Sequence, residues 1–137
     1  MHAHWIRVIA IAALGAVALS GCAAYQQKSR TKSLELQSQA YVKAIRWSKF
    51  DSAVGFLRAR NGRLPPTNLN DYAGIRVTSS NMTLSSESAD ATEAQMIAVF
   101  NYYRSDQASV RSVTQTADWW WDDLDQAWYL DSGLPEF

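Results

Sequence analysis

Few side chains in this sequence have the chemistry of a functional site, and the most distinctive is a single thiol. Cys22 is the only cysteine, and it follows Val8–Leu19, a segment that is apolar throughout. A short basic start followed by an apolar run of this length is typical of a signal peptide, whereas a membrane-spanning helix needs about 20 apolar residues. Polar residues return at Tyr25–Gln27. We therefore expect a cleaved signal rather than an uncleaved anchor.

The residues around the thiol carry a recognisable motif. Leu19-Ser20-Gly21-Cys22 has a branched apolar residue, two small residues and then cysteine, which resembles the lipobox of bacterial lipoproteins. The resemblance implies signal cleavage between Gly21 and Cys22 and a diacylglyceryl thioether on the Cys22 sulfur. It also implies a stable lipid anchor, since two or more acyl chains hold a protein in a membrane. In Gram-negative lipoproteins an aspartate directly after the cysteine tends to retain the protein at the inner membrane, and here Ala23-Ala24 follow instead. The resemblance therefore implies the periplasmic face of the outer membrane, with an inner membrane or a Gram-positive cell membrane as the alternative.

Cleavage before Cys22 would also remove both histidines, His2 and His4. Zinc and most transition-metal sites need imidazole or thiolate ligands, and serine or cysteine nucleophiles need a base that is usually histidine. An acylated Cys22 cannot form a disulfide. We therefore expect a non-enzymatic protein with no catalytic residue, no metal and no cofactor.

An acidic run, Asp122-Asp123-Leu124-Asp125, raises the possibility of a calcium site. An EF-hand-type loop needs alternating acids, a glycine at its sixth position and a distal glutamate, and this spacing is missing. Aspartates are common in hairpin turns because they hydrogen-bond to their own backbone. The run therefore favours a turn. A hydrolase that uses Asp118 or Asp122 is a weaker hypothesis, because it depends on carboxylates alone.

Charge is distributed unevenly along the chain. Residues 28–63 hold nine Lys or Arg against two acids, a net +7, and residues 71–137 hold three Arg against eleven acids, a net −8. The favoured interpretation is that the two parts neutralise each other when packed. The alternative places the basic part against anionic headgroups, at about 1 kcal/mol per cation. A nucleic-acid partner is not expected outside the cytoplasm.

A polar tether over Ala23–Lys32 precedes a helical pattern that starts near Ser33. Apolar residues then recur at steps of three and four. These residues are Leu36, Ala40, Ala44, Trp47, Phe50, Val54 and Leu57, with Tyr41 and Ile45 widening the stripe. Ser48-Lys49-Phe50-Asp51 resembles a capping sequence, so two helices over 33–47 and 49–60 are preferred to one long helix. Asn61-Gly62 and Pro65-Pro66 would end the second.

After the prolines the apolar period changes to two, which predicts strands. We expect strands at Ile75–Ser85, with a bulge near Ser79–Asn81, and at Met96–Tyr103, Ser109–Asp122 and Ala127–Leu130. The connections are short and polar, which favours antiparallel hairpins. The expected chain is α+β: a signal helix over 1–21, a lipidated tether over 22–32, and a single periplasmic domain over 33–137. In that domain two short helices cover one face of a four-stranded antiparallel meander.

The aromatic residues are concentrated near the C-terminus. Within a strand, Trp119 and Trp121 share a face, which we expect in the core against Trp47 and Phe50, while Trp120 points the other way. Trp120, with one of Trp128 or Tyr129, then forms a candidate binding surface. Either the segment Leu134-Pro135-Glu136-Phe137 folds back over it as a lid, which is the favoured account, or it is an open aromatic groove.

The predicted order of helix, helix and four strands resembles the nuclear transport factor 2-like or cystatin-like group. The resemblance rests on Tyr41–Asp51 and extends loosely over Ser33–Leu130. It implies a cone between helices and sheet that can take small ligands, but no catalytic residue is carried over.

Two functions follow as hypotheses. The first is an accessory or scaffolding lipoprotein that is held at the membrane and docks on an envelope protein. The alternative is a module with an aromatic-lined cavity that binds a lipid, a glycan or a peptide.

Overall fold

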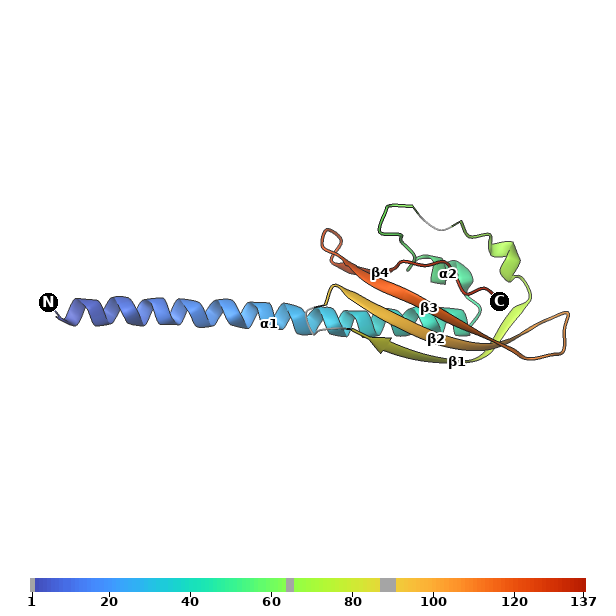
Figure 1. Ribbon diagram of the computed structural model, residues 1–137, viewed down its shortest axis with the longest axis horizontal. Helices are drawn as coiled ribbons and strands as arrows, with labels where there is room; N and C mark the ends of the chain where they lie inside the picture. Colours follow the sequence, from blue (N-terminus) through green and yellow to red (C-terminus); the bar gives the residue numbers. More distant parts are fainter. Residues whose placement is uncertain (1, 64–65, 87–90) are drawn as a thin grey trace.

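One helix, α1 (His2–Arg46), makes up the first third of the chain and projects from one end of the domain (Figure 1). The computed structural model describes residues 2–63, 66–86 and 91–137, with side chains from residue 21 onward except at 24 and 27. The segment expected as a polar tether, 22–32, is helical and continuous with the helix that enters the domain. It is rich in residues that favour helix and contains no proline.

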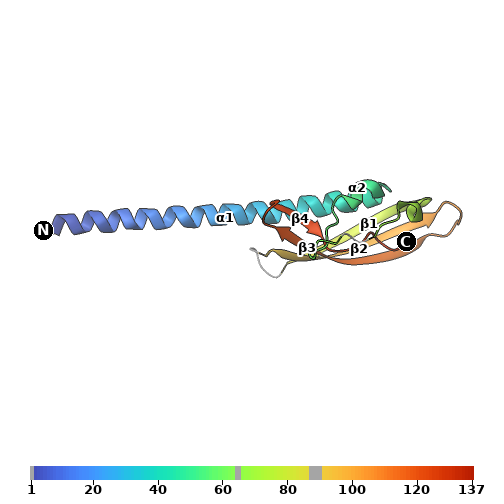
Figure 2. The ribbon, with the colours of Figure 1, turned by 90° about the horizontal axis from the view of Figure 1, so that it is seen from above.

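The C-terminal half of α1 lies along one face of the sheet (Figure 2). Its buried residues recur at steps of three and four: Leu34, Ser38, Tyr41, Val42 and Ile45. The predicted stripe is wrong at Leu36 and Trp47, which are 57% and 64% exposed. The buried face instead centres on Tyr41 and Ile45, because these side chains remove more apolar area from water than Ala40 and Ala44 can.

The helix ends where the sequence predicted a break, but for a different reason. Ser48 adopts a left-handed φ of 56°. Its N–H donates to the carbonyl of Ile45, and the N–H of Lys49 donates to the carbonyl of Ala44. These two bonds form the Schellman arrangement that closes a helix C-terminus. The hydroxyl of Ser48 donates to the carbonyl of Ile75 at 3.1 Å, so the predicted N-cap role of Ser48 is wrong.

The second helix, α2 (Phe50–Val54), is shorter than the predicted 49–60. After Gly55 the chain leaves the helix and runs parallel to the edge of the sheet. The N–H of Leu130 donates to the carbonyl of Phe56 at 2.8 Å, and the N–H of Arg58 donates to the carbonyl of Leu130 at 3.1 Å. Pairing with the sheet edge therefore replaces helical bonds. A 3-10 turn, η1 (Leu69–Tyr72), was not predicted.

The four-stranded antiparallel sheet is confirmed, in the order β1-β2-β3-β4. The strands are β1 (Ile75–Ser85), β2 (Glu93–Arg104), β3 (Arg111–Asp122) and β4 (Ala127–Leu130). The predicted bulge is present, with its register shift between Val77 and Ser79. The predicted β1–β2 connection falls partly on residues 87–90, which lie outside the described residues.

The core lies between the sheet and α1, and the C-terminal tail helps to close it. Phe137 packs against Tyr102 at 4.9 Å and against Phe50 at 5.7 Å between ring centroids. Leu134 is buried, and Gln115 donates to the carbonyl of Gly133 at 2.9 Å. The tail thus folds onto the core face, and the prediction of a lid over Trp120 is wrong.

Candidate functional site

The strand alternation sorts the tryptophans onto two faces. Trp119 is fully buried, and its ring meets those of Tyr41 and Phe56 edge-on at 6.1 and 6.4 Å. Trp128, a predicted member of the binding surface, is only 2% exposed and packs on the core face against Trp121 at 5.6 Å. That assignment of Trp128 is wrong, because its position in β4 pairs with Trp121 and so shares the inner face.

Trp120 and Tyr129 do lie together on the outer face of the sheet. They are paired residues of β3 and β4, and their rings are 5.8 Å apart. The chain after α2 covers them in part. The indole N–H of Trp120 donates to the carbonyl of Arg58 at 2.8 Å, and the Arg58 guanidinium lies 3.7 Å from the centre of the Tyr129 ring. The aromatic pair is therefore half-buried beneath an arginine.

Arg58 also holds the acidic turn. It donates to Asp122 at 3.1 Å and to Asp125 at 2.6 Å, and the Tyr129 hydroxyl donates to Asp125 at 2.9 Å. The pKa of Asp125 is lowered, mainly by the hydrogen bond from Arg58 and then by that from Tyr129. The pKa of Tyr129 is raised, mainly by desolvation and then by its bond to Asp125. We call Arg58, Trp120, Asp122, Asp125 and Tyr129 the outer-face cluster.

The carboxylates of the turn are used inside the protein. The second oxygen of Asp122 accepts from the backbone N–H groups of Leu124 and Asp125, as expected of a turn aspartate. Asp123 accepts from the indole of Trp121 at 2.9 Å. Among the described residues, no three acidic, histidine or cysteine side chains are grouped as metal ligands. The turn that the sequence favoured is confirmed.

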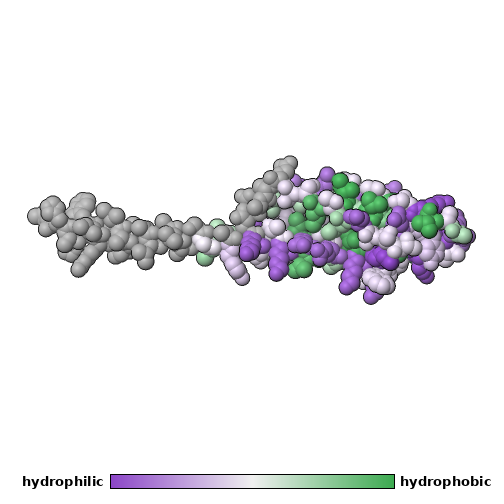
Figure 3. All heavy atoms as spheres, turned by 90° about the horizontal axis from the view of Figure 1, so that it is seen from below, coloured by the Kyte–Doolittle hydropathy of each residue, from purple (hydrophilic) through white to green (hydrophobic). Residues whose placement is uncertain are grey.

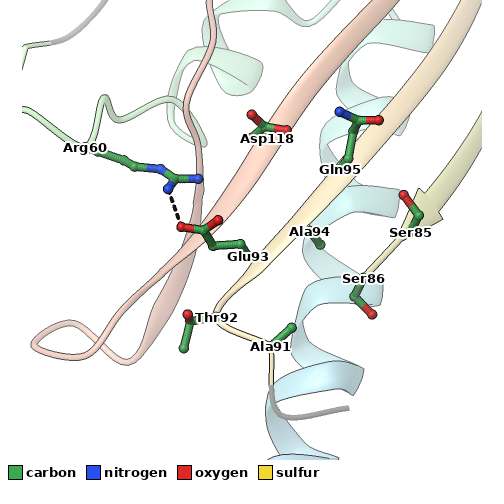
Figure 4. A pocket seen from close by; sticks show the side chains of 9 residues that line it. All are labelled: Arg60, Ser85, Ser86, Ala91, Thr92, Glu93, Ala94, Gln95 and Asp118. Atoms are coloured by element: carbon green, nitrogen blue, oxygen red, sulfur yellow. Dashed lines mark hydrogen bonds and ion pairs between the residues drawn. The ribbon is translucent and has the colours of Figure 1, made fainter. Parts of the chain in front are cut away.

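A shallow hollow of about 550 Å³ lies beside the cluster, between the ends of β1, β2 and β3 (Figure 4). Arg60 forms ion pairs with Glu93 and Asp131 at its margin, and Asp118 points into it. The other lining residues are small or polar: Ser85, Ser86, Ala91, Thr92, Ala94 and Gln95. The predicted aromatics do not line this hollow, so it does not match an aromatic-lined cavity.

Opposite charges from the two parts of the chain meet here. Arg58 and Arg60 from the basic part pair with four carboxylates of the acidic part. This supports the interpretation of mutual neutralisation for these two arginines. On the face drawn in Figure 3, hydrophobic residues form separate groups among hydrophilic ones.

Cys22 is exposed on α1, and Arg30, further along the same helix, contacts the domain. The indole of Trp128 donates to the carbonyl of Arg30 at 3.1 Å, and the Arg30 guanidinium lies 4.9 Å from the Trp121 ring. At about 1.5 Å per residue, Arg30 lies roughly 12 Å along the helix from Cys22. Within the described side chains, no helical segment is long and apolar enough to cross a membrane.

No protein-family description, no curated protein and no solved structure matches this chain. The resemblances to bacterial lipoproteins and to the nuclear transport factor 2-like or cystatin-like group therefore stay predictions.

Proposed function

We propose that this protein is a non-enzymatic envelope lipoprotein, held by acylated Cys22 at the periplasmic face of the outer membrane, whose domain docks on an envelope protein. One observation carries the proposal. The sole thiol follows Leu19-Ser20-Gly21 and is exposed on the helix that enters the core of the domain. The Cys22 side chain is therefore accessible to an acylating enzyme.

The helical tether gives the anchor a defined geometry. Cleavage before Cys22 would leave about two helical turns between the lipid and Arg30, where Trp128 is hydrogen-bonded. A rigid helix of this length would hold the domain close to the membrane and in a limited range of orientations. This suits a scaffold that presents one end of its domain to a partner.

The outer-face cluster fits a structural role in this scheme. Its arginine, aromatic rings and carboxylates satisfy one another, and they connect the chain after α2 to the β3–β4 turn. Such closed pairing leaves few groups for a substrate. The alternative of an aromatic-lined ligand cavity is less well supported, because Tyr41, Phe56 and Trp119 fill the space between α1 and the sheet.

Acylation is tested by expressing the full chain in a Gram-negative host with radiolabelled palmitate. We expect the wild type to incorporate label and to fractionate with the outer membrane, even after a high-salt wash. Cys22→Ser should lose the label, and Ala23→Ser serves as the matched control that keeps it. Ala23→Asp should keep the label but move to the inner membrane. An unlabelled wild type, or a labelled Cys22→Ser variant, would refute the anchor.

A further inference from the structure

The end of the domain opposite Cys22 carries a second open hollow. It has a volume of about 590 Å³ and lies between the end of α1 and the start of β1. We call it the distal groove, and its main lining residues are Arg46, Trp47, Arg76, Val77, Thr78 and Tyr103. At about 1.5 Å per residue, Arg46 lies roughly 36 Å along α1 from Cys22. The groove therefore lies far from the proposed anchor.

Its aromatic residues are exposed rather than packed in the core. Trp47 is 64% exposed and Tyr103 is 37% exposed. The guanidinium of Arg46 lies 5.5 Å from the centre of the Trp47 ring. Tryptophan, tyrosine and arginine dominate the binding energy of protein interfaces, because they combine large apolar area with hydrogen-bonding groups. An exposed tryptophan with an arginine over its ring has the composition of a docking site.

The groove is also positively charged. Arg46 donates to the carbonyl of Val77 at 2.5 Å, and Arg76 donates to the carbonyl of Ile75 at 3.0 Å. Each bond fixes a guanidinium that still has further N–H donors. No acidic residue is among those lining the groove, and the ion pairs of the described residues belong to Arg58 and Arg60. Arg46 and Arg76 are thus held in place by backbone carbonyls, and no carboxylate lines the groove beside them. This arrangement suits an anionic ligand.

The adjoining strand edge favours a peptide over other anions. β1 pairs with β2 on one side and is the edge strand of the sheet. Ser48 and Arg46 cap the carbonyls of Ile75 and Val77 at the start of this edge. From Thr78 to Ser86 the sequence has no charge and no proline, two of the devices by which edge strands avoid further pairing. A third device, a bulge, is confined to the Val77–Ser79 end of β1, so the edge beyond it is regular. An extended peptide backbone can add to such an edge.

We propose that the distal groove binds an acidic, extended peptide segment of an envelope protein. Its carboxylates contact Arg46 and Arg76, its apolar side chains contact Trp47, and its backbone adds to β1 beyond Thr78. This proposal deepens the docking function and rests on it, by assigning the surface and the chemistry of the partner.

The test uses the full chain in detergent micelles and a fluorescein-labelled peptide of alternating glutamate and valine, measured by anisotropy. We expect saturable binding that weakens with added salt, and slowed hydrogen exchange in Ser79–Ser85. Trp47→Ala and Arg76→Gln should each weaken binding at least about tenfold, since each replaces an interface anchor. Leu36→Ala and Arg111→Gln, which change exposed residues outside the groove, should bind as the wild type does.

Four results would overturn the proposal: no binding, equal binding of a lysine–valine peptide, unchanged binding by both groove variants, or displacement by polygalacturonate or by anionic vesicles at equal charge. Thermal unfolding of each variant separates loss of binding from loss of folding. The palmitate experiment is independent of this one. Protein that incorporates palmitate but does not bind the peptide would refute only the proposed peptide site. Protein that binds the peptide but incorporates no palmitate would refute only the proposed lipid anchor.

Discussion

At the scale of single residues, the buried polar side chains of this domain need hydrogen-bond partners inside the protein. The hydroxyl of Tyr41 is buried between α1 and the sheet and donates to Gln115 at 2.9 Å, and Gln115 in turn donates to the carbonyl of Gly133. Burial raises the pKa of Tyr41, an effect only partly opposed by the bond to Gln115. One polar chain thus connects the helix, β3 and the C-terminal tail.

Tyr41→Phe should therefore lower the free energy of unfolding by about 1 to 3 kcal/mol, because it leaves the buried oxygen of Gln115 without its donor. Urea unfolding followed by circular dichroism measures the change. Tyr25→Phe is the matched control, since Tyr25 is 77% exposed, and it should stay within about 0.5 kcal/mol of the wild type. Equal stability of Tyr41→Phe and the wild type would contradict the role of this bond.

The carboxyl of Asp125 provides a second residue-scale prediction. Its pKa is lowered from an ordinary value of 3.8, mainly by Arg58. A lowered pKa in the folded state means that the contribution to stability is present above pH 3.8 and is lost as the pH falls through the lowered value. In Arg58→Ala the pKa of Asp125 should rise toward 3.8, as measured by NMR titration of the side-chain carboxyl.

Arg60→Ala is the control for this titration, because Arg60 pairs with Glu93 and Asp131 instead. It should leave the pKa of Asp125 close to its wild-type value. A pKa of Asp125 that does not move in Arg58→Ala would show that Tyr129, rather than Arg58, sets it.

At the scale of elements, backbone conformation at the junctions determines where helices and strands begin and end. Ser48 ends α1 in a left-handed conformation, and Gly74 precedes β1 with a φ of 82°. The carbonyl of Gly74 accepts from the N–H of Ser105 at 2.8 Å, so the start of β1 is joined to the turn after β2. A Cβ on residue 74 would lie 2.7 Å from the Ser105 hydroxyl oxygen.

Gly74→Ala should lower the free energy of unfolding by about 1 to 3 kcal/mol, from the left-handed φ together with this close contact. The double variant Gly74→Ala/Ser105→Ala removes the contact and leaves the φ, since the next atom of Ser105 is 3.9 Å away. Gly74→Ala should therefore lower the free energy of unfolding by less in the Ser105→Ala background than in the wild type. Full recovery would show that the φ costs nothing, and no recovery would show that the contact is relieved by small movements.

At the scale of the whole molecule, the two ends of the domain differ in what they present. The β3–β4 turn lies at the end from which α1 projects, and the β2–β3 turn lies at the other end (Figure 1). Leu124 is 94% exposed in the first turn, and Val110 is 65% exposed at the second. The twelve residues of β3 separate them, which at about 3.3 Å per residue is roughly 40 Å.

With the proposed anchor in place, Leu124 lies near the bilayer and Val110 far from it. Leu124→Cys and Val110→Cys, each labelled with a thiol-reactive fluorophore in vesicles that contain nitroxide lipids, should differ accordingly. We expect strong quenching at residue 124 and weak quenching at residue 110. Acylated Cys22 does not react with the label, so labelling of the parent chain is the control. Equal quenching at both residues would contradict an orientation in which the β3–β4 turn lies near the bilayer and the β2–β3 turn lies far from it.

Much of the sheet was predictable, because its signals are local. The alternation of Ile75 and Val77 with polar residues marked β1, and β4 was predicted with its observed bounds. The helices were predicted less well. The stripe containing Leu36 and Trp47 satisfied the helical period as well as the one containing Tyr41 and Ile45, and only packing against the sheet chose between them.

The candidate site was also predictable only in part. Alternation along β3 placed Trp120 opposite Trp119 and Trp121, but the choice between Trp128 and Tyr129 depended on the β3–β4 register. The cover of the outer face could not be predicted, because Arg58 comes from a segment expected to be helical. Its ion pairs with Asp122 and Asp125 span more than sixty residues of sequence.

Features that depend on neighbouring residues could be predicted from the chain alone: the motif at Cys22, the alternating strands, the acidic turn and the order of the helices and strands. The buried helix face, the end of α2, the exposed tryptophans and the position of the tail became known only from the folded domain. These four features depend on burial and pairing between segments that are distant in the sequence. At Phe56–Arg58 a sheet edge offers backbone bonds that a local pattern cannot reveal. Trp47 is exposed because Tyr41 and Ile45, rather than Trp47, lie on the helix face that packs against the sheet.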